Sequence, residues 1–232
     1  MRRSCLLFAL VAMLVAAPAA QAGGGDHRHG HGHGHKHGHG SRSAIVPTGF
    51  AGAPLLTKWW KAPLSVPSND PDHPWTRQGC VSVTRFVALD YGGHCIVKAG
   101  TWIFEVAASV ECSNIEADPF HADTPLEAAK CGLENDLLMT EVTLTLDGGT
   151  PVSLLNRRFG TFMVPGRVVV PESPVFGGTP GEIMRFGGHG YVAWIRPLPV
   201  GEHTLHGHQE GTVEGFPPSG VIDYDTRITV TG

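Results

Sequence analysis

The sequence predicts a mainly β protein: an antiparallel β-sandwich, of jelly-roll or immunoglobulin-like type, with one short helix. Three observations predict this fold class. The chain of 232 residues contains 31 glycines and 18 prolines, a composition that favours short strands and many turns. Segments rich in β-branched and aromatic residues recur along the chain, with turn residues between them. One further segment combines a capping signal with helical periodicity.

The clearest strand signal is the segment TEVTLTLDGGTPVSLL, which starts at Thr140. Val142, Leu144 and Leu146 alternate with polar residues, a pattern typical of a strand with one buried face. Asp-Gly-Gly at 147–149 supplies the turn that follows. The other predicted strands lie within 80–89, 100–110, 158–164, 167–171, 190–198, 201–209 and 221–232.

The predicted helix covers residues 125–138. Thr124 can cap it, Pro125 fits the first helical position, and Glu127 completes a capping box. Gly132 lies inside the helix and is expected to weaken it. Its expected apolar face consists of Leu126, Ala129, Leu133 and Leu137.

The chain divides into four segments by composition. Residues 1–22 predict a signal peptide, because two arginines precede a short apolar run and a small-residue cleavage pattern. Residues 23–43 are a low-complexity tail of glycine and histidine, which we expect to be disordered. Residues 44–75 form a lead-in rich in proline and tryptophan, expected to be ordered but irregular. Residues 76–232 form the predicted β-sandwich domain.

Cysteine usage agrees with export, and the predicted location is secreted or periplasmic. Four cysteines follow the signal peptide: Cys80, Cys95, Cys112 and Cys131. An even number of cysteines in an oxidising compartment favours disulfides, and four cysteines allow three pairings. We favour the sequential pairing, Cys80–Cys95 and Cys112–Cys131, because each bond then closes a short loop.

Charge and hydropathy argue against two classes of partner. The chain has 17 Lys and Arg against 21 Asp and Glu and shows no basic stripe, so we expect no nucleic acid partner. No stretch after the signal peptide approaches 18 consecutive apolar residues, so we expect no retained membrane anchor. Nucleophile, phosphate-loop and zinc-protease motifs are absent from the sequence. A protein or carbohydrate partner stays unidentified.

The first candidate metal site is a histidine tract in the tail. It places a histidine at every second position, with glycine at most positions between them: His27, His29, His31, His33, His35, His37 and His39. Neutral imidazole is a ligand for zinc, nickel and copper, and intervening glycines let the backbone fold round an ion. The tract therefore predicts binding of one of these transition-metal ions. A solubilising tail is the alternative interpretation.

The second candidate metal site is in GEHTLHGHQE. On a strand, His206 and His208 share one face and His203 lies on the other, with Glu210 or Glu214 as a carboxylate ligand. A purely structural strand is the alternative.

One isolated histidine and three tryptophans are further candidate functional residues. His189 lies in FGGHGY, which we expect to be a flexible loop. Trp59, Trp60 and Trp102 are expected to pack in the core, with a sugar-stacking platform as the alternative.

The order of several motifs resembles a family of uncharacterised secreted bacterial β-rich proteins. These motifs are WWKAPLSVPSNDP, QGCVSVTRFVAL, CIVKAGTWIFEV, LTLDG, GYVAWIRPLPVGEHTLHGH and DYDTRITV. The resemblance covers about residues 57–231, and members often end in a strand similar to GxHTIHF. It implies a secreted β-rich fold with a recurring histidine strand at 203–206. It implies no established activity, and the histidine tract is not a family feature.

Three functional hypotheses follow. The leading one is an exported, non-enzymatic β-sandwich protein that binds transition-metal ions through its histidine-rich tail. The second is a carbohydrate-binding or protein-binding sandwich with an incidental tail. The third is a metal-dependent enzyme centred on His206 and His208.

Overall fold

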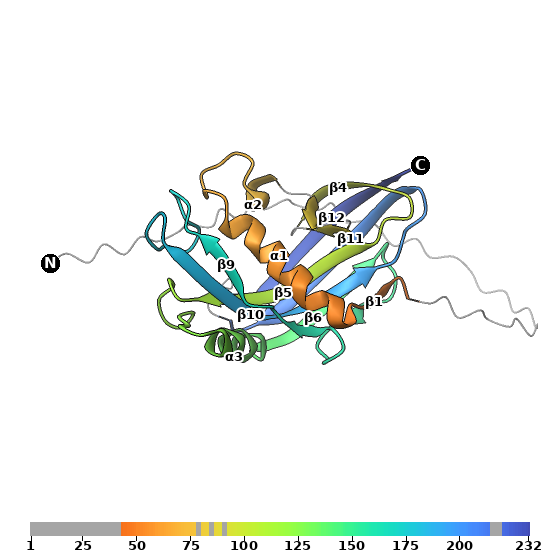
Figure 1. Ribbon diagram of the computed structural model, residues 1–232. Coiled ribbons are helices and arrows are strands. Elements are labelled where there is room, and N and C mark those ends of the chain that lie inside the picture. The colour runs from red at the N-terminus through yellow and green to blue at the C-terminus, as the bar shows by residue number, and fades with distance from the viewer. Residues whose placement is uncertain (1–42, 78–79, 84–85, 90–91, 214–219) are drawn as a thin grey trace, which may run out of the picture. The chain divides into compact units, whose positions relative to one another are not determined.

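The computed structural model describes residues 43–77, 80–83, 86–89, 92–213 and 220–232. Within this part of the chain, two β-sheets pack face to face. Helices cover the outer face of the larger sheet and one end of its inner face (Figure 1). The predicted fold class, a mainly β sandwich with a short helix, is confirmed. The predicted signal peptide lies outside the described residues.

The larger sheet is built round β10, its longest strand. β5 pairs with one edge of β10, and β9, β8 and β1 pair in succession with the other edge. β3 and β2 extend the sheet beyond β5. The seven strands are β1 (Ile45–Pro47), β2 (Cys80–Val83), β3 (Phe86–Leu89), β5 (Ile103–Ser113), β8 (Gly160–Phe162), β9 (Gly166–Val169) and β10 (Ile183–Ile195).

The smaller sheet has the order β4-β12-β11-β6-β7. Its strands are β4 (Gly93–Lys98), β6 (Met139–Leu146), β7 (Val152–Ser153), β11 (Gly201–Gly211) and β12 (Val221–Thr231). The expected antiparallel pairing holds for most of the structure, but β3 pairs in parallel with β5, and β4 in parallel with β12. The predicted turn at 147–149 follows directly after β6.

The core between the two sheets draws on alternating residues of the smaller sheet, whereas β5 and β10 are buried on both faces. On β11, Leu205, Gly207 and Gln209 are buried, while Thr204 and Glu210 are exposed. Burial of aliphatic side chains of this kind is the main term that stabilises a sandwich.

One polar contact also crosses the core between the sheets. The Tyr224 hydroxyl of β12 donates a hydrogen bond to the buried Glu105 carboxylate of β5, at 2.8 Å. The pairing satisfies a polar group that burial would otherwise leave at high energy.

The lead-in is not the irregular segment that we expected, because it contains a 13-residue helix. η1 (Gly49–Ala51) leads into α1 (Gly52–Leu64), and α2 (Pro74–Arg77) follows. The buried residues of α1 recur at helical spacing: Gly52, Leu55, Leu56, Trp59, Trp60, Pro63 and Leu64. They pack on the outer face of the larger sheet, against Phe104, Val192 and other residues of β5 and β10. Trp59 and Trp60 are therefore core residues, as expected.

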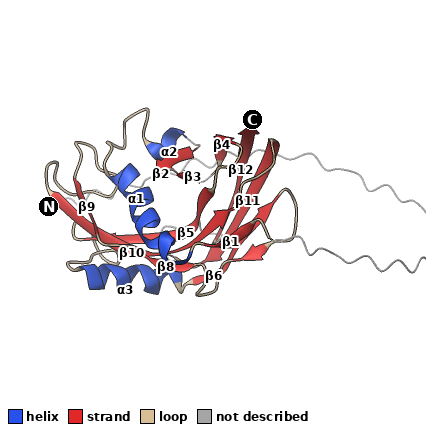
Figure 2. Cartoon of the chain, turned by 45° about the vertical axis from the view of Figure 1, so that its right-hand side comes forward, coloured by secondary structure: helices blue, strands red, loops and turns tan. Residues whose placement is uncertain are grey.

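The second long helix, α3 (Pro125–Asp136), begins as predicted. The Thr124 side chain accepts a hydrogen bond from the Glu127 amide, and the Glu127 carboxylate accepts one from the Thr124 amide, which completes the capping box. Figure 2 shows β10 and β5 passing between α1 on one side and α3 on the other. α3 therefore covers one end of the sheet face whose other end meets the smaller sheet.

The predicted apolar face of α3 is wrong. Leu126 is 80% exposed and Leu137 is 67% exposed, whereas Ala128, Gly132 and Asp136 are the buried residues. Close approach decides this face, because a Cβ on Gly132 would lie 2.4 Å from the backbone nitrogen of His189. The small residues Ala128 and Gly132 therefore face the sheet. Leu126 and Leu137 face outward, and Ala129 and Leu133 are half-buried.

Two disulfides fasten the described part of the chain. They join Cys80 to Cys95 and Cys112 to Cys131, which is the sequential pairing. The second bond ties α3 to β5 across 6.3 Å between Cα atoms. Among the residues described, none of the helices has the length and apolar character needed to cross a bilayer.

Candidate functional site

The second predicted histidine group lies on the outer face of the smaller sheet, which is turned away from the core. His206 and His208 share this face of β11, as expected, with side-chain exposures of 43% and 25%. His203 has the opposite parity along the strand and does not join them. The two side chains are thus held by a regular strand and reached by solvent from one side.

Aspartates on the neighbouring strand orient both imidazoles. In the antiparallel register Asp225 of β12 lies opposite His206, and Asp223 lies opposite His208. His206 Nδ1 donates to Asp225 Oδ1 at 3.0 Å, and His208 Nδ1 donates to Asp223 Oδ1 at 2.8 Å. A carboxylate can only accept here, so in the neutral ring the proton sits on Nδ1 and the Nε2 lone pair is left for another partner.

Two glutamates complete a group of metal-ligating side chains round His208. Glu141 of β6 lies directly opposite Glu210 of β11, on the same face. One ligand atom each from Glu141, His208 and Glu210 lie within 4.8 Å of one another. Glu210 was a predicted ligand, whereas Glu141 was missed, because only the register between β6 and β11 brings it here. Glu214 lies outside the described residues.

The expectation that His189 lies in a flexible loop is wrong. His189 lies in the middle of β10 and is 6% exposed. Its Nδ1 donates to Asp136 Oδ2 of α3 at 2.7 Å, and its ring packs edge-on against Phe162 and Tyr191. The glycines that suggested a loop serve close packing: a Cβ on Gly188 would lie 2.0 Å from a backbone oxygen of β5.

Burial dominates the electrostatics of this second pair. It raises the pKa of Asp136 to about 6, although the hydrogen bond from His189 acts in the opposite direction. Burial, with the nearby Asp136 charge, also raises the pKa of Tyr191. The other Asp136 oxygen, Oδ1, is buried and has no hydrogen-bond partner among the described residues. Such a pair anchors α3 to the sheet and offers no open coordination position.

Three other histidines have structural partners. His203 Nδ1 donates to Asp147 Oδ2 at 2.8 Å, which ties the turn after β6 to β11. Burial lowers the pKa of His203, but the hydrogen bonds to Asp147 and to the Pro199 carbonyl outweigh it and raise that pKa. His73 is buried and bonds to the Pro63 carbonyl, and His94 bonds to the hydroxyl of a β12 threonine.

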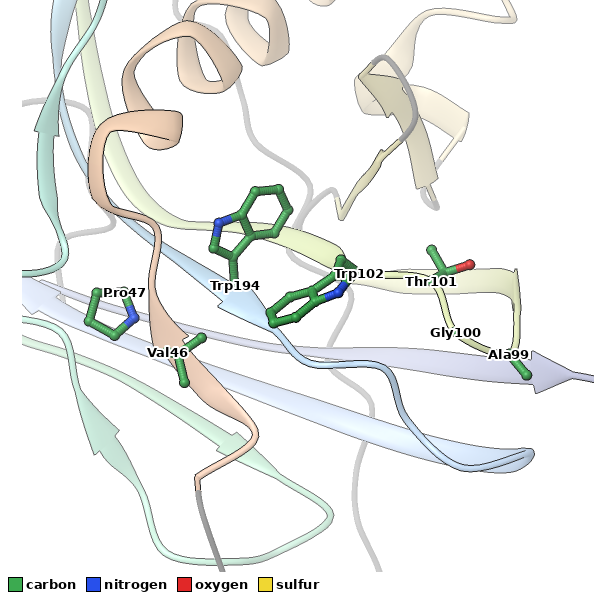
Figure 3. Close-up of a pocket in the computed structure, with 7 residues that line it drawn as sticks. All are labelled: Val46, Pro47, Ala99, Gly100, Thr101, Trp102 and Trp194. Carbon is green, nitrogen blue, oxygen red and sulfur yellow. The ribbon is translucent and has the colours of Figure 1, made fainter.

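A separate hollow of about 790 Å³ lies at the start of β5, where β1 meets β10. Figure 3 shows Trp102 and Trp194 beside each other, with Val46 and Pro47 of β1 on the same side. The two indole rings meet edge to face at 6.1 Å, and Trp102 is 37% exposed. The expectation that Trp102 packs in the core is therefore wrong, and among Trp59, Trp60 and Trp102 it alone is exposed.

The histidine tract from His27 to His39 lies outside the described residues, so it stays a prediction from sequence.

Comparison of the chain with protein-family models, with curated proteins and with solved structures finds no match in any of the three. The resemblance described above therefore stays a prediction, and function has to be argued from the residues themselves.

Proposed function

We propose that this is an exported, non-enzymatic β-sandwich protein that binds transition-metal ions through its histidine tract. The observation that carries the proposal is the alternation of seven histidines over 13 residues, from His27 to His39. Several imidazoles on a glycine-rich backbone can wrap one ion of zinc, nickel or copper. The folded domain holds the tract outside the cell or in the periplasm.

The proposal of export has independent support. The N-terminal segment has the charge, apolar run and small-residue ending of a signal peptide. The two disulfides are compatible with an oxidising compartment, since such bonds are rare where thiols are kept reduced.

The test is a titration with zinc and with nickel, followed by calorimetry. One sample is the mature chain from Gly23, and its control is the same chain with the seven tract histidines replaced by serine. The unsubstituted chain should bind at least one additional ion. Equal stoichiometry in the two samples would contradict the proposal.

Protons should compete with metal for the tract. Imidazole binds metal only in its neutral form, and its ordinary pKa is about 6.5. The additional zinc should therefore be released as the pH falls through about 6, with uptake of protons. An affinity that stays constant from about pH 7.5 to about pH 5 would show that imidazole is not the ligand.

The hollow at Trp102 supports a second candidate function, carbohydrate binding. An exposed indole beside Trp194 offers the flat apolar surface on which a sugar ring stacks. The test is tryptophan fluorescence during titration with a panel of soluble oligosaccharides, using Trp102→Ala as the control. A response that the variant retains would exclude this hollow.

We do not propose an enzyme centred on His206 and His208. Each imidazole lies on a sheet face where neighbouring side chains leave it partly exposed. General acid–base catalysis needs a residue within hydrogen-bond reach of a positioned substrate, and a sheet face supplies no such positioning.

A further inference from the structure

We propose that Glu141, His208 and Glu210 form a zinc-class metal site on the folded domain. This site is independent of the histidine tract and so goes beyond the function proposed above. Its ligands come from two adjacent strands, β6 and β11, and project from the outer face of the smaller sheet. Asp223 on β12 is the residue that orients the histidine.

The strand register places two like charges in direct opposition. Glu141 and Glu210 are a cross-strand pair, and like charges in that arrangement destabilise a sheet. Among the described residues, neither carboxylate forms an ion pair with a lysine or an arginine. A divalent cation between them would turn this repulsion into attraction. The unfavourable pair is thus a feature that a bound ion would explain.

The histidine is oriented as a metal ligand usually is. The hydrogen bond from His208 Nδ1 to Asp223 Oδ1 fixes the ring and its tautomer. The remaining nitrogen, Nε2, then carries the lone pair, and no hydrogen bond among the described residues uses it. A carboxylate that holds the far side of a ligating imidazole is the common outer partner of a zinc site.

The separation of the ligand atoms suits a small ion once the exposed side chains close round it. Two ligand atoms bound to tetrahedral zinc by bonds of about 2.1 Å lie about 3.4 Å apart. The three atoms lie within 4.8 Å of one another, and both glutamates are exposed. Rotation of the two exposed glutamate side chains can close the remaining distance. A fourth position is left for water.

The donor set selects the class of metal. One imidazole with two carboxylates is typical of borderline divalent ions such as zinc. Calcium and magnesium prefer sets made only of oxygen, and copper(I) prefers sulfur. The two glutamate charges and the neutral imidazole also balance the charge of a divalent ion. We therefore expect zinc to bind more tightly than magnesium or calcium.

The experiment uses the mature chain with the seven tract histidines replaced by serine, so that zinc cannot bind to the tract. Calorimetry should show one equivalent of zinc. Glu141→Gln and His208→Ala should each weaken zinc binding at least about tenfold, and Asp223→Asn should weaken it by about the same factor. His94→Ala is the matched control, because His94 is an exposed histidine on β4 of the same sheet that bonds to Thr229 and is outside the triad. It should leave the affinity within about twofold.

A second readout separates a metal ligand from a structural residue. Glu141→Gln removes the like-charge contact, so it should raise the thermal midpoint of the metal-free protein slightly. The same substitution should reduce the rise in midpoint that a given excess of zinc produces in the parent protein. These two effects have opposite signs, and a general weakening of the fold cannot produce both.

Several outcomes would overturn the site. They are the absence of zinc binding in the tract-substituted chain, binding that Glu141→Gln or His208→Ala leaves unchanged, and binding that His94→Ala weakens as much as they do. A chain that keeps the tract but carries Glu141→Gln and His208→Ala tests the tract alone. Failure of this site and failure of the proposed function are therefore distinguishable.

Discussion

The same pair of side chains, a histidine whose Nδ1 donates to an aspartate, occurs in two contrasting regions. Under α3, the His189 and Asp136 side chains are 8% and 1% exposed. On the outer sheet face, those of His206 and Asp225 are 43% and 69% exposed. The two hydrogen bonds have similar lengths, 2.7 and 3.0 Å. Their surroundings, not their own geometry, therefore decide what each pair can do.

The buried pair is committed to packing. Aromatic rings cover the His189 imidazole, and desolvation of Asp136 makes its charge costly. The outer pairs lie where water and ions reach them, so their imidazoles can meet a ligand. A histidine–aspartate pair therefore fastens elements together in the interior and can present a metal ligand at the surface.

The largest expected effect follows from breaking the buried pair. His189→Ala would leave the Asp136 carboxyl without its hydrogen bond and open a cavity beneath α3. Removing one partner of a buried pair costs about 3–5 kcal/mol of unfolding free energy. Urea denaturation at neutral pH measures the loss. A loss below about 1 kcal/mol would show that the pair does not anchor α3.

The next effect depends on pH. The pKa of Asp136 is raised from 3.8 to about 6 in the folded protein, so its protonated form is favoured there. This contribution to stability is fully present below pH 3.8 and is lost as the pH rises through about 6. Asp136→Asn cannot titrate. Its stability relative to the parent should therefore increase by about 3 kcal/mol between these limits.

Denaturation of both proteins at several pH values from 3.5 to 7.5, in steps of about one unit, tests this sign. Parallel pH profiles for the parent and Asp136→Asn would contradict it.

The smallest effect is expected at the outer pairs. Asp225→Asn replaces one exposed hydrogen-bonded carboxylate on the sheet face without disturbing the core. Exposed pairs contribute little, so the unfolding free energy should change by no more than about 0.5 kcal/mol. The measurement is the same urea denaturation as for His189→Ala. A loss as large as that of the buried pair would erase the distinction between the two regions.

Helix α1 is an element that we did not predict from the sequence. Its apolar residues recur at helical spacing from Leu55 to Leu64, so the signal was present in the sequence. Prolines at 54 and 63 suggested an irregular segment. Pro54 is tolerated because it lies in the first turn, where its missing amide is not needed. Pro63 lies one residue before the end of the helix at Leu64, so little helix follows it.

Features that depend only on neighbours along the chain could be predicted from the sequence alone. Alternation at Val142, Leu144 and Leu146 predicted a strand with one buried face, and Thr124 with Glu127 predicted the start of α3. The parity of His206 and His208 placed them on one face of β11. These features hold because strand alternation and helix capping are local geometry, fixed within a few residues.

Contacts between residues of different helices and strands became known only from the tertiary structure. The glycines round His189 indicated a loop by local preference, but the close approach of β5 and α3 requires them inside a strand. The register of β6 against β11 brings Glu141 to His208, and a shift of one residue would place it on the other face. Contacts between distant segments depend on packing and register, which no single segment of the sequence contains.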